Sequence, residues 1–379
     1  MNRTYATVGS WHYRPSARGF TVYEFNPETA ELTLVEHGFD DASIGSQALN
    51  GARGIVYACD ERGSRRGEVG GGGYVLTLRI DPDAGKPTLL GEQPSLGTEP
   101  SHICLDRSGR YALVVHHTDG GHVTQLEKDE NGRYESHVAY DDAAIVLFPL
   151  GPDGVLGPAC DVSIQKGEGS GAHAQAKLHS VTSDPSGDIY MICDKGTDRI
   201  YAYAVNREAG KLVQTGELRA PDGYHPRYGA FHPTLPLYYF NNEAAPRLCA
   251  VRYDGKGESL SLAYDVPVQK SQDEGMPSEA SDLLMSADGR ALYLSDRGSN
   301  RICVFGLDDK GEPTLRQCVD CGGKNPRGLC FSLDGRFLLA ANSDTENIAV
   351  FTVRQDGLLT LYRDDQKASC PANICMYRP

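Results

Sequence analysis

The 379-residue sequence contains no long apolar run. No hydrophobic stretch approaches the roughly 20 residues that a membrane-spanning helix needs, and the opening residues MNRTYATVGSW lack the basic start and apolar centre of a signal peptide. Basic residues are scarce as well: 37 Lys and Arg stand against 51 Asp and Glu, a formal net charge of −14. Such a chain repels nucleic acid and anionic lipid. We therefore expect a cytoplasmic protein with a small-molecule substrate and no nucleic-acid or membrane partner; its oligomeric state stays open.

Several familiar site motifs are also missing. No G-x-S-x-G elbow is present, which disfavours a covalent serine hydrolase, and the glycine run GEVGGGGY lacks the GK[ST] ending of a phosphate-binding loop. Cys318 and Cys321 form a CxxC, but no second pair or histidines follow at ligand spacing. Most of the eleven cysteines stand singly in hydrophobic runs, as reduced buried thiols do. We expect no cofactor and no metal site, and interpret the CxxC as ordinary packing.

Helical periodicity is absent from every window of useful length. Short strands rich in Val, Ile, Tyr and Leu alternate with turns of Asp, Pro and Gly. One plan recurs: an apolar strand, a turn ending in Ser-Gly or Asp-Gly, and a second strand. It is found in SHICLDRSGRYALVVHH, LHSVTSDPSGDIYMICDKGTDRIYAYAV, ASDLLMSADGRALYLSDRGSNRICVF and NPRGLCFSLDGRFLLAANSDTENIAVF. YHPRYGAFHPTLPLYYFNNEA follows the same plan, and weaker copies contain YATVGSW and GIVYACDERG.

These seven copies predict a radial array of small antiparallel sheets, because a single unit cannot bury both of its faces. We therefore predict an all-β fold, a seven-bladed β-propeller, as one domain over residues 1–379. Residues 67–73, 118–142 and 166–177 are expected to be inserted loops, with AAIVLFPL as the third strand after the second insertion. The C-terminal PANICMYRP is expected to close the ring by pairing near the N-terminus.

Polar residues gather at one end of the predicted hairpins. Residues equally far from a hairpin turn lie side by side, so Arg227 and Glu243, each eight residues from Leu235, should meet. The same count places Arg297 beside Glu279, Arg327 opposite Asn342, His179 opposite Cys193 beside Lys195, and His102 opposite Val115 beside His116 and His117. A polar cluster drawn from five blades is costly unless it is paired or holds a ligand. The pattern predicts a functional site at one mouth of the propeller.

Three segments carry a family resemblance: LHSVTSDPSG, HPRYGAFHP followed by NNE, and SDRGSNRICVF. They resemble the seven-bladed propeller lactonases, which comprise bacterial 6-phosphogluconolactonases of the propeller type and fungal carboxy-cis,cis-muconate cyclases. Members commonly read PHxHS, GPRH followed by NE, and SNRG at these places. The resemblance covers nearly the whole chain. It implies that His179, Arg227, Glu243 and Arg297 lie in or beside the active site.

The sequence departs from that pattern at three places. Lys177 stands where the first His of PHxHS would be, Tyr228 replaces the His after Pro-Arg, and His116-His117 occupies a position where the family often has Asn-Tyr. We expect these changes to preserve the fold and the position of the site. We expect them to affect which substrate binds.

The residues at this mouth suit the opening of a lactone, which needs a base for water and a donor for the developing oxyanion. We assign the base to His179, and the anion clamp and oxyanion donor to Arg227 and Arg297. Glu243 orients Arg227 or His179, or donates a proton. The residues expected to contact substrate are His102, His116, His117, Lys177, Tyr228, Arg327 and Asn342.

We thus predict a metal-independent lactonase acting on a sugar lactone such as 6-phosphogluconolactone. Several alternatives remain open: a lactonising enzyme like the carboxymuconate cyclases, a relative acting on another sugar lactone or keto-sugar, or a non-catalytic propeller that serves as a binding platform. A further alternative is a calcium-dependent lactonase, which the two arginines and the histidine disfavour. Its oxygen ligands would come from Glu61, Asn241, Asn242, Glu243, Asp296 and Asn342.

Overall fold

The computed structural model describes residues 3–11, 14–64, 69–118, 120–269 and 275–379. In this part of the chain the strands form seven four-stranded antiparallel sheets and one two-stranded sheet. The helical segments described are two single turns of 3-10 helix, η1 (Gly51–Arg53) and η2 (Gly171–His173). No helix among the described residues is long and apolar enough to cross a membrane. The prediction of an all-β seven-bladed propeller is confirmed.

We number the blades in chain order and give the strands of each from the innermost outward. Blade 1 contains β30 (Pro371–Tyr377), β1 (Thr4–Ser10), β2 (Phe20–Phe25) and β3 (Leu32–Gly38); blade 2 contains β4 (Ile44–Asn50), β5 (Ile55–Asp60), β6 (Tyr74–Ile80) and β7 (Pro87–Pro94); blade 3 contains β8 (Pro100–Leu105), β9 (Tyr111–His116), β12 (Ala143–Pro149) and β13 (Asp161–Gln165). Blade 4 contains β14 (Leu178–Ser183), β15 (Ile189–Asp194), β16 (Arg199–Asn206) and β17 (Lys211–Arg219); blade 5 contains β18 (Pro226–Phe231), β19 (Leu237–Asn242), β20 (Arg247–Tyr253) and β21 (Leu260–Pro267). Blade 6 contains β22 (Ala280–Met285), β23 (Ala291–Asp296), β24 (Arg301–Leu307) and β25 (Pro313–Asp320); blade 7 contains β26 (Pro326–Phe331), β27 (Phe337–Asn342), β28 (Asn347–Val353) and β29 (Leu359–Lys367).

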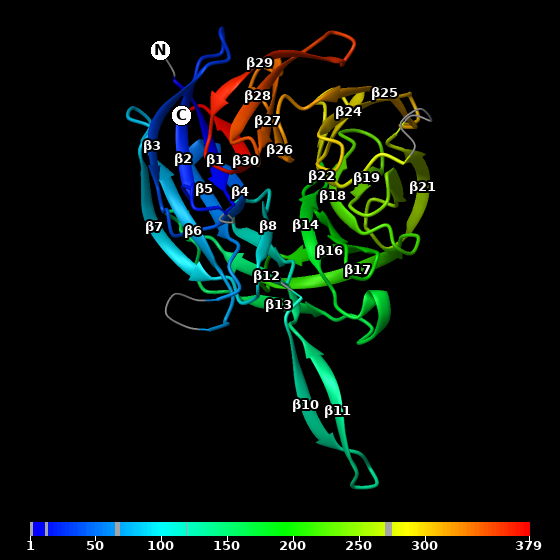
Figure 1. Ribbon diagram of the computed structural model, residues 1–379. Helices are drawn as coiled ribbons and strands as arrows, with labels where there is room; N and C mark the ends of the chain where they lie inside the picture. The colour runs from blue at the N-terminus through cyan, green and yellow to red at the C-terminus, as the bar shows by residue number, and fades with distance from the viewer. Residues whose placement is uncertain (1–2, 12–13, 65–68, 119, 270–274) are drawn as a thin grey trace.

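The ring is closed by the two ends of the chain. The C-terminal strand β30 pairs antiparallel with β1, with Tyr377 opposite Tyr5 and Ile374 opposite Val8. The termini therefore lie close together in Figure 1. The innermost strands contact one another in the order β4, β8, β14, β18, β22, β26, β30 and back to β4. The predicted closure by PANICMYRP is confirmed.

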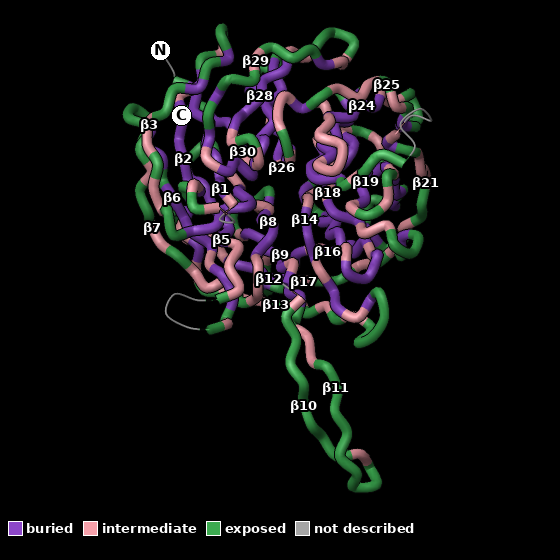
Figure 2. Tube along the Cα trace, viewed as in Figure 1, coloured by how far each residue is buried: buried purple, intermediate pink, exposed green. Residues whose placement is uncertain are grey.

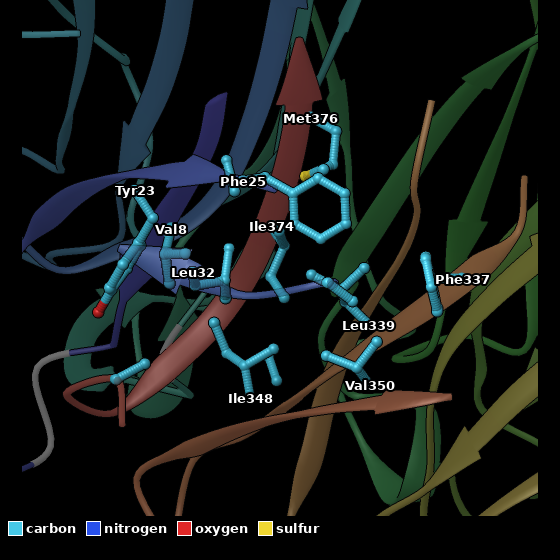
Figure 3. Packing of buried hydrophobic residues seen from close by; sticks show 14 residues of the cluster. Val8, Tyr23, Phe25, Leu32, Phe337, Leu339, Ile348, Val350, Ile374 and Met376 are labelled. Atoms are coloured by element: carbon cyan, nitrogen blue, oxygen red, sulfur yellow. The ribbon is translucent and has the colours of Figure 1, made fainter. Parts of the chain in front are cut away.

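The hydrophobic core is divided among the interfaces between blades. Seven clusters of buried side chains are found in the described residues, each joining two neighbouring blades. Figure 2 shows the buried chain in the body of the ring and the exposed chain around its edge. The closing interface packs Val8 and Ile374 of blade 1 against Leu339 and Val350 of blade 7 (Figure 3). Each blade is thus stabilised mainly by its neighbours.

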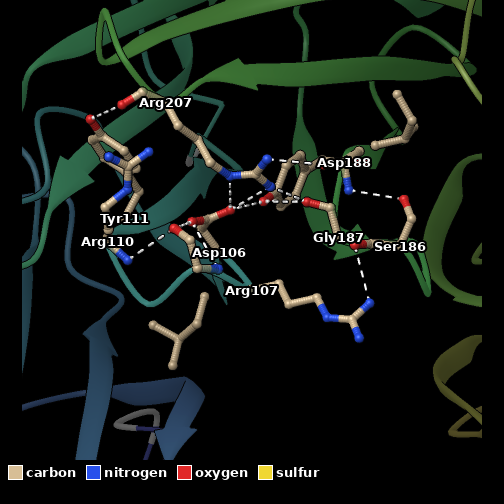
Figure 4. A network of polar contacts seen from close by, with 12 residues as sticks. Asp106, Arg107, Arg110, Tyr111, Ser186, Gly187, Asp188 and Arg207 are labelled. Carbon is tan, nitrogen blue, oxygen red and sulfur yellow. Dashed lines mark hydrogen bonds and ion pairs between the residues drawn. The ribbon is translucent and has the colours of Figure 1, made fainter.

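A polar network joins blades 3 and 4 at their strand turns (Figure 4). The carboxylate of Asp106 accepts hydrogen bonds from the Tyr190 hydroxyl at 2.8 Å and from Nε of Arg207 at 2.9 Å. Arg207 also pairs with Asp188 at 2.9 Å, and Arg107 donates to the Ser186 carbonyl at 3.1 Å. Burial alone would raise the pKa of Asp106, but these hydrogen bonds and Arg207 hold it below its ordinary value. The network fixes two blades at the face where their hairpin turns lie.

Residues 118–142 are not the loop that was predicted. They contain a two-stranded hairpin, β10 (His122–Lys128) and β11 (Tyr134–Tyr140), which projects from the ring (Figures 1 and 2). The turn contains Asn131-Gly132, a strong hairpin signal, with Gly132 at φ 77°. Blade 3 resumes at β12, so AAIVLFPL is its third strand as predicted. The other insertions behave as loops: 166–177 contains only η2, and residues 69–73 contain no strand, while 67–68 lie outside the described residues.

The division of the core predicts the effect of a substitution in the closing strand. Ile374 is 3% exposed and belongs to the cluster between blades 1 and 7. Ile374→Ala should lower the free energy of unfolding by about 2–5 kcal/mol, since it removes buried methyl groups and leaves a cavity. Urea unfolding followed by tyrosine fluorescence measures this. Leu361→Ala, at a side chain 42% exposed on blade 7, is the control and should change stability by about 0.5 kcal/mol or less; equal losses would contradict this account of closure.

Candidate active site

One backbone hydrogen bond, repeated in all seven blades, builds the mouth. The residue that follows the second strand of each blade donates its N–H to a carbonyl just before the innermost strand, as in Glu243 N to His225 O at 2.9 Å and Lys195 N to Lys177 O at 3.0 Å. We call these residues the exit ring. They are Trp11, Glu61, His117, Lys195, Glu243, Arg297 and Ser343. Their side chains start from equivalent places around one end of the channel.

The innermost strands supply a second set of side chains at the same end. Each of them has a register shift near its N-terminal end, and such bulges re-aim side chains. The second residue of each strand lies in the shift: Gly45, Ser101, His179, Arg227, Ser281, Arg327 and Ala372. Three functional candidates, His179, Arg227 and Arg327, are therefore presented by bulges.

The bulges also decide how well simple hairpin counting works. His102 does lie opposite Val115, as predicted. The partners predicted for His179 and Arg327 are wrong, because Cys193 pairs with Ser180 and Asn342 pairs with Pro326. In both strands the extra residue shifts the register by one.

Glu243 is the centre of an ion-pair network. Its carboxylate lies 2.7 Å from Nε of Arg227, 2.6 Å from Nζ of Lys195 and 3.4 Å from Nη2 of Arg297. Burial would raise the pKa of Glu243, but Arg227, Lys195 and Arg297 outweigh burial and hold it well below the ordinary value. Glu243 is thus a permanent carboxylate that orients three cations. This geometry favours the orienting role over that of proton donor.

The cations of the mouth crowd one another. Burial, together with Arg227 and Arg327 nearby, lowers the pKa of Arg297 to about 9 although it pairs with Glu243 and, at 2.8 Å, with Glu279. Burial likewise lowers the pKa of Lys195 despite Glu243. Arg327 lies with its guanidinium 4.1 Å from the ring centre of Trp11, the chain's single tryptophan. Such crowding favours the binding of an additional anion.

His179 is held as a neutral imidazole. Its side chain is 8% exposed, its ring centroid lies 5.3 Å from that of His117 and 5.2 Å from that of Tyr228, and its Nδ1 has no hydrogen-bond partner among the described residues. Burial lowers the pKa of His179 well below its ordinary value, and Arg227 and His117 add to this. A neutral imidazole can act as a base.

Glu61 is a residue of this mouth that sequence reasoning did not assign to catalysis. It belongs to the exit ring, and its carboxylate occupies the space above Gly45, where an added Cβ would lie 2.0 Å from Oε1. Burial raises the pKa of Glu61 to about 8, with Arg327 opposing and Glu99 reinforcing the shift. Glu61 therefore carries a proton at neutral pH, unlike Glu243. Alignment of the repeats at their exit positions would have found Glu61 and Lys195.

Some of the residues predicted to contact substrate lie at the mouth, whereas others lie away from it. His117 lies there and pairs with Glu99 at 3.2 Å, and Arg327 joins through its bulge. Lys177 lies at the rim, with Nζ beside Gly120 at the base of the β10–β11 hairpin. His116 and Asn342 end the second strands of their blades, fully buried, and bind backbone carbonyls of Ala144 at 2.9 Å and Cys321 at 3.0 Å. His116 thus binds β12 of its own blade, and Asn342 binds the backbone that follows β25 of blade 6. Both side chains are engaged away from the cluster.

His102 and Tyr228 lie deeper in the channel, with ring centroids 5.3 Å apart. Burial lowers the pKa of His102 to about 4. Beyond this pair the channel widens into a cavity of about 680 Å³, lined mainly by apolar side chains of the innermost strands. The polar mouth and the apolar cavity thus meet at His102 and Tyr228.

Two of the residues considered as calcium ligands, Asp296 and Asn241, are engaged in other bonds. Asp296 accepts the N–H groups of Glu279 at 2.7 Å and Gly298 at 3.0 Å, and Asn241 bridges Tyr228 N and Ser281 O. The one group in the described residues with metal-ligand spacing is His173, Asp198 and Asp222. There Arg219 pairs with Asp222 at 3.2 Å, and Asp198 already accepts His173 Nε2 at 2.8 Å.

Comparison with known proteins identifies the family. The model of the seven-bladed β-propeller lactonases matches residues 5–136 and 113–377. The chain belongs to this family. The lactonase-family chain is 27% identical over 354 residues to the 6-phosphogluconolactonase of Formosa agariphila, covering 91% of each. It is 25% identical over 366 residues to the 6-phosphogluconolactonase of Bacillus subtilis, covering 94% of this chain and 93% of the relative.

Solved structures share the fold of this lactonase-family chain. The periplasmic gluconolactonase of Pseudomonas aeruginosa has a TM-score of 0.82 at 21% identity, and 99% of each chain is covered. A protein from Lactobacillus plantarum has a TM-score of 0.82 at 19% identity with the same coverage. At these identities the likeness concerns architecture.

The Glu243 network predicts a substitution effect that depends on pH. Glu243→Gln leaves one buried cation, Arg227, and two partly buried cations, Lys195 and Arg297, without their shared carboxylate. The loss should lower the free energy of unfolding by roughly 3–5 kcal/mol. The pKa of Glu243 is lowered in the folded state. Its contribution to folding stability is therefore complete above the pKa of the unfolded state, about 4.3, and is lost as the pH falls through the lower pKa of the folded state. Urea unfolding near pH 7 should show a large difference in the free energy of unfolding between wild type and variant. Near pH 3 this difference should be smaller.

The control for this prediction is an exposed ion pair. Glu28 is 78% exposed and lies 3.4 Å from Arg336. Glu28→Gln should change stability by about 1 kcal/mol or less. If Glu243→Gln lowers the free energy of unfolding near pH 7 by no more than Glu28→Gln does, the central role of Glu243 is refuted.

Proposed function

We propose that this protein hydrolyses a sugar lactone that carries an anionic group, with 6-phosphogluconolactone as the expected substrate. The observation that carries the proposal is the crowding of Arg227, Lys195 and Arg297 around a single carboxylate beside a neutral histidine. An anion relieves that crowding, and arginine offers a planar fork suited to phosphate. The names of the two curated relatives support the same substrate class.

In the proposed mechanism His179 is the general base. Its neutral imidazole takes a proton from a water that attacks the lactone carbonyl. Arg227 stabilises the oxyanion that develops, since its Nη1 is fixed by a 3.0 Å hydrogen bond to the hydroxyl of Ser281 and its Nε by Glu243. Arg297 and Arg327 hold the anionic group of the substrate. No step in this scheme uses a metal or cofactor.

Glu61 completes the scheme as general acid. When the tetrahedral intermediate collapses, the ring oxygen leaves as an alkoxide and needs a proton. Glu61 is protonated at neutral pH because its pKa is raised to about 8, whereas Glu243 is ionised. The two glutamates therefore have separate roles, one supplying the proton and one orienting the cations.

The first test measures hydrolysis of 6-phosphogluconolactone and of unphosphorylated gluconolactone, corrected for spontaneous opening. Wild type should prefer the phosphorylated lactone, and His179→Ala should lose about 10²–10⁴-fold in kcat, the range of general-base catalysis. The variant should still bind 6-phosphogluconate, as reported by fluorescence of Trp11. His122→Ala, at an exposed residue of β10, is the matched control and should keep full activity.

Failure has a clear meaning in this experiment. If folded wild type turns over neither lactone, the hydrolase proposal is wrong, and cyclisation or simple binding replaces it. If wild type is active and His179→Ala keeps its rate, the base is another group.

The Glu61 assignment predicts the pH profile. A general acid must be protonated, so kcat/KM should decline as pH rises through about 8, the pKa of Glu61. No acid limb from His179 is expected between about pH 5 and 8, because its pKa is lowered well below the ordinary value, near 6.5. Glu61→Gln should lower kcat/KM by about 10²-fold near pH 7 and abolish the alkaline decline. The exposed Glu312→Gln should alter neither; an unchanged decline in Glu61→Gln would rule Glu61 out.

A further inference from the structure

Two cysteines 15 residues apart lie directly opposite each other on consecutive strands of blade 6. Cys303 of β24 and Cys318 of β25 are register partners, and their sulfur atoms are 2.8 Å apart. Both thiols also point at the Val268 carbonyl, at 3.5 Å and 3.7 Å. No other two sulfur atoms among the described residues are in hydrogen-bonding contact. The proximity is therefore particular to this pair.

The CxxC of the sequence does not form a pair. Cys321 is fully buried with the cluster between blades 6 and 7, and its thiol contacts the Gly323 carbonyl at 3.1 Å. Cys303 and Cys318 pack instead with the cluster between blades 5 and 6. Cys318 and Cys321 thus face opposite sides of the blade, so the spacing in sequence conceals the real partner of Cys318.

The strand geometry already satisfies the requirements of a disulfide. Opposite residues of antiparallel strands have Cα atoms roughly 4.5–5.5 Å apart, and disulfides join Cα atoms roughly 4.4–6.8 Å apart. A cross-link between Cys303 and Cys318 therefore needs rotation of side chains and no movement of a strand. It would tie β25, the outermost strand of blade 6, to β24.

We propose that Cys303 and Cys318 form a modification site, which an oxidant of the peroxide class converts into an intrachain disulfide. Cys318 is half-buried and Cys303 is 2% exposed, so Cys318 reacts first. Its thiolate attacks a peroxide oxygen, the O–O bond breaks, and a sulfenic acid and hydroxide form. The sulfur of Cys303 then attacks that of Cys318, the S–O bond breaks, and water leaves. In sum, two thiols and one hydrogen peroxide give one disulfide and two waters.

The environment of the two thiols affects the rate of this oxidation. The hydrogen bond between the two thiols, together with burial, raises the pKa of Cys303 well above its ordinary value. Thiolate is the reactive form, so a raised pKa slows attack. The pair should oxidise over minutes to hours rather than as a rapid sensor, and a dithiol reductant should reverse it.

The experiment treats the full-length protein with hydrogen peroxide, denatures it, alkylates the free thiols and maps the peptides. The expected result is a loss of about 2 Da, two fewer alkylated thiols than the eleven cysteines provide, and a peptide linking Cys303 to Cys318 that dithiothreitol abolishes. Thermal unfolding should show a higher Tm for the oxidised protein and no such shift in Cys318→Ser.

Cys321→Ser is the matched control and should still form the cross-link. A disulfide that contains Cys321, or oxidation of Cys318 to sulfinic acid without a linked peptide, would overturn the proposal. The mapping on wild-type protein decides the matter even if a Cys318→Ser variant fails to fold. Activity toward lactones does not enter the readout, so the test is independent of the proposed function.

Discussion

The mouth of this propeller depends on the hydrogen bond that joins the end of each second strand to the chain entering the innermost strand. It recurs in every blade, from Trp11 N with Cys370 O to Ser343 N with Asn325 O. Because it fixes the backbone on both sides of each exit residue, side chains of opposite charge can be held together without rearranging strands. The ion pairs of the mouth are a consequence of this backbone arrangement rather than its cause.

Electrostatics then separates residues that look alike in the sequence. Glu61 and Glu243 occupy equivalent exit positions, yet the pKa of Glu61 is raised to about 8 while that of Glu243 is lowered. The difference follows from their surroundings. Glu243 contacts three cations, whereas for Glu61 desolvation and the nearby Glu99 outweigh the opposing effect of Arg327 on the pKa. A single structural position thereby holds a protonated carboxyl group in one blade and a charged carboxylate in another.

The sequence was sufficient to predict the architecture, because the repeat, the turn residues and the C-terminal strand all describe local structure. It also predicted the contact between Arg227 and Glu243, which forms although Arg227 lies in a bulge and the strands pair Pro226 with Asn242. It did not show the bulges that shift His179 and Arg327 by one residue, since an extra residue leaves no mark in composition. The assignment of His116 and Asn342 to the site has a different cause. Adjacent strand residues face opposite sides of the sheet, and counting from the turn does not say which side faces the mouth. The Asn131-Gly132 turn did signal the β10–β11 hairpin, which the interpretation as a loop overlooked.

The separation of the mouth from the interblade clusters bears on how such proteins change over evolutionary time. Each blade offers the mouth its exit residue, and most blades add a side chain from the bulge. The packing that stabilises the blades lies elsewhere, in residues such as Leu339 and Ile374. Substitutions at mouth positions remove little buried apolar surface. A lineage can therefore explore new ligands by exchanging polar residues at the mouth, provided that Glu243 and the cations paired with it change together.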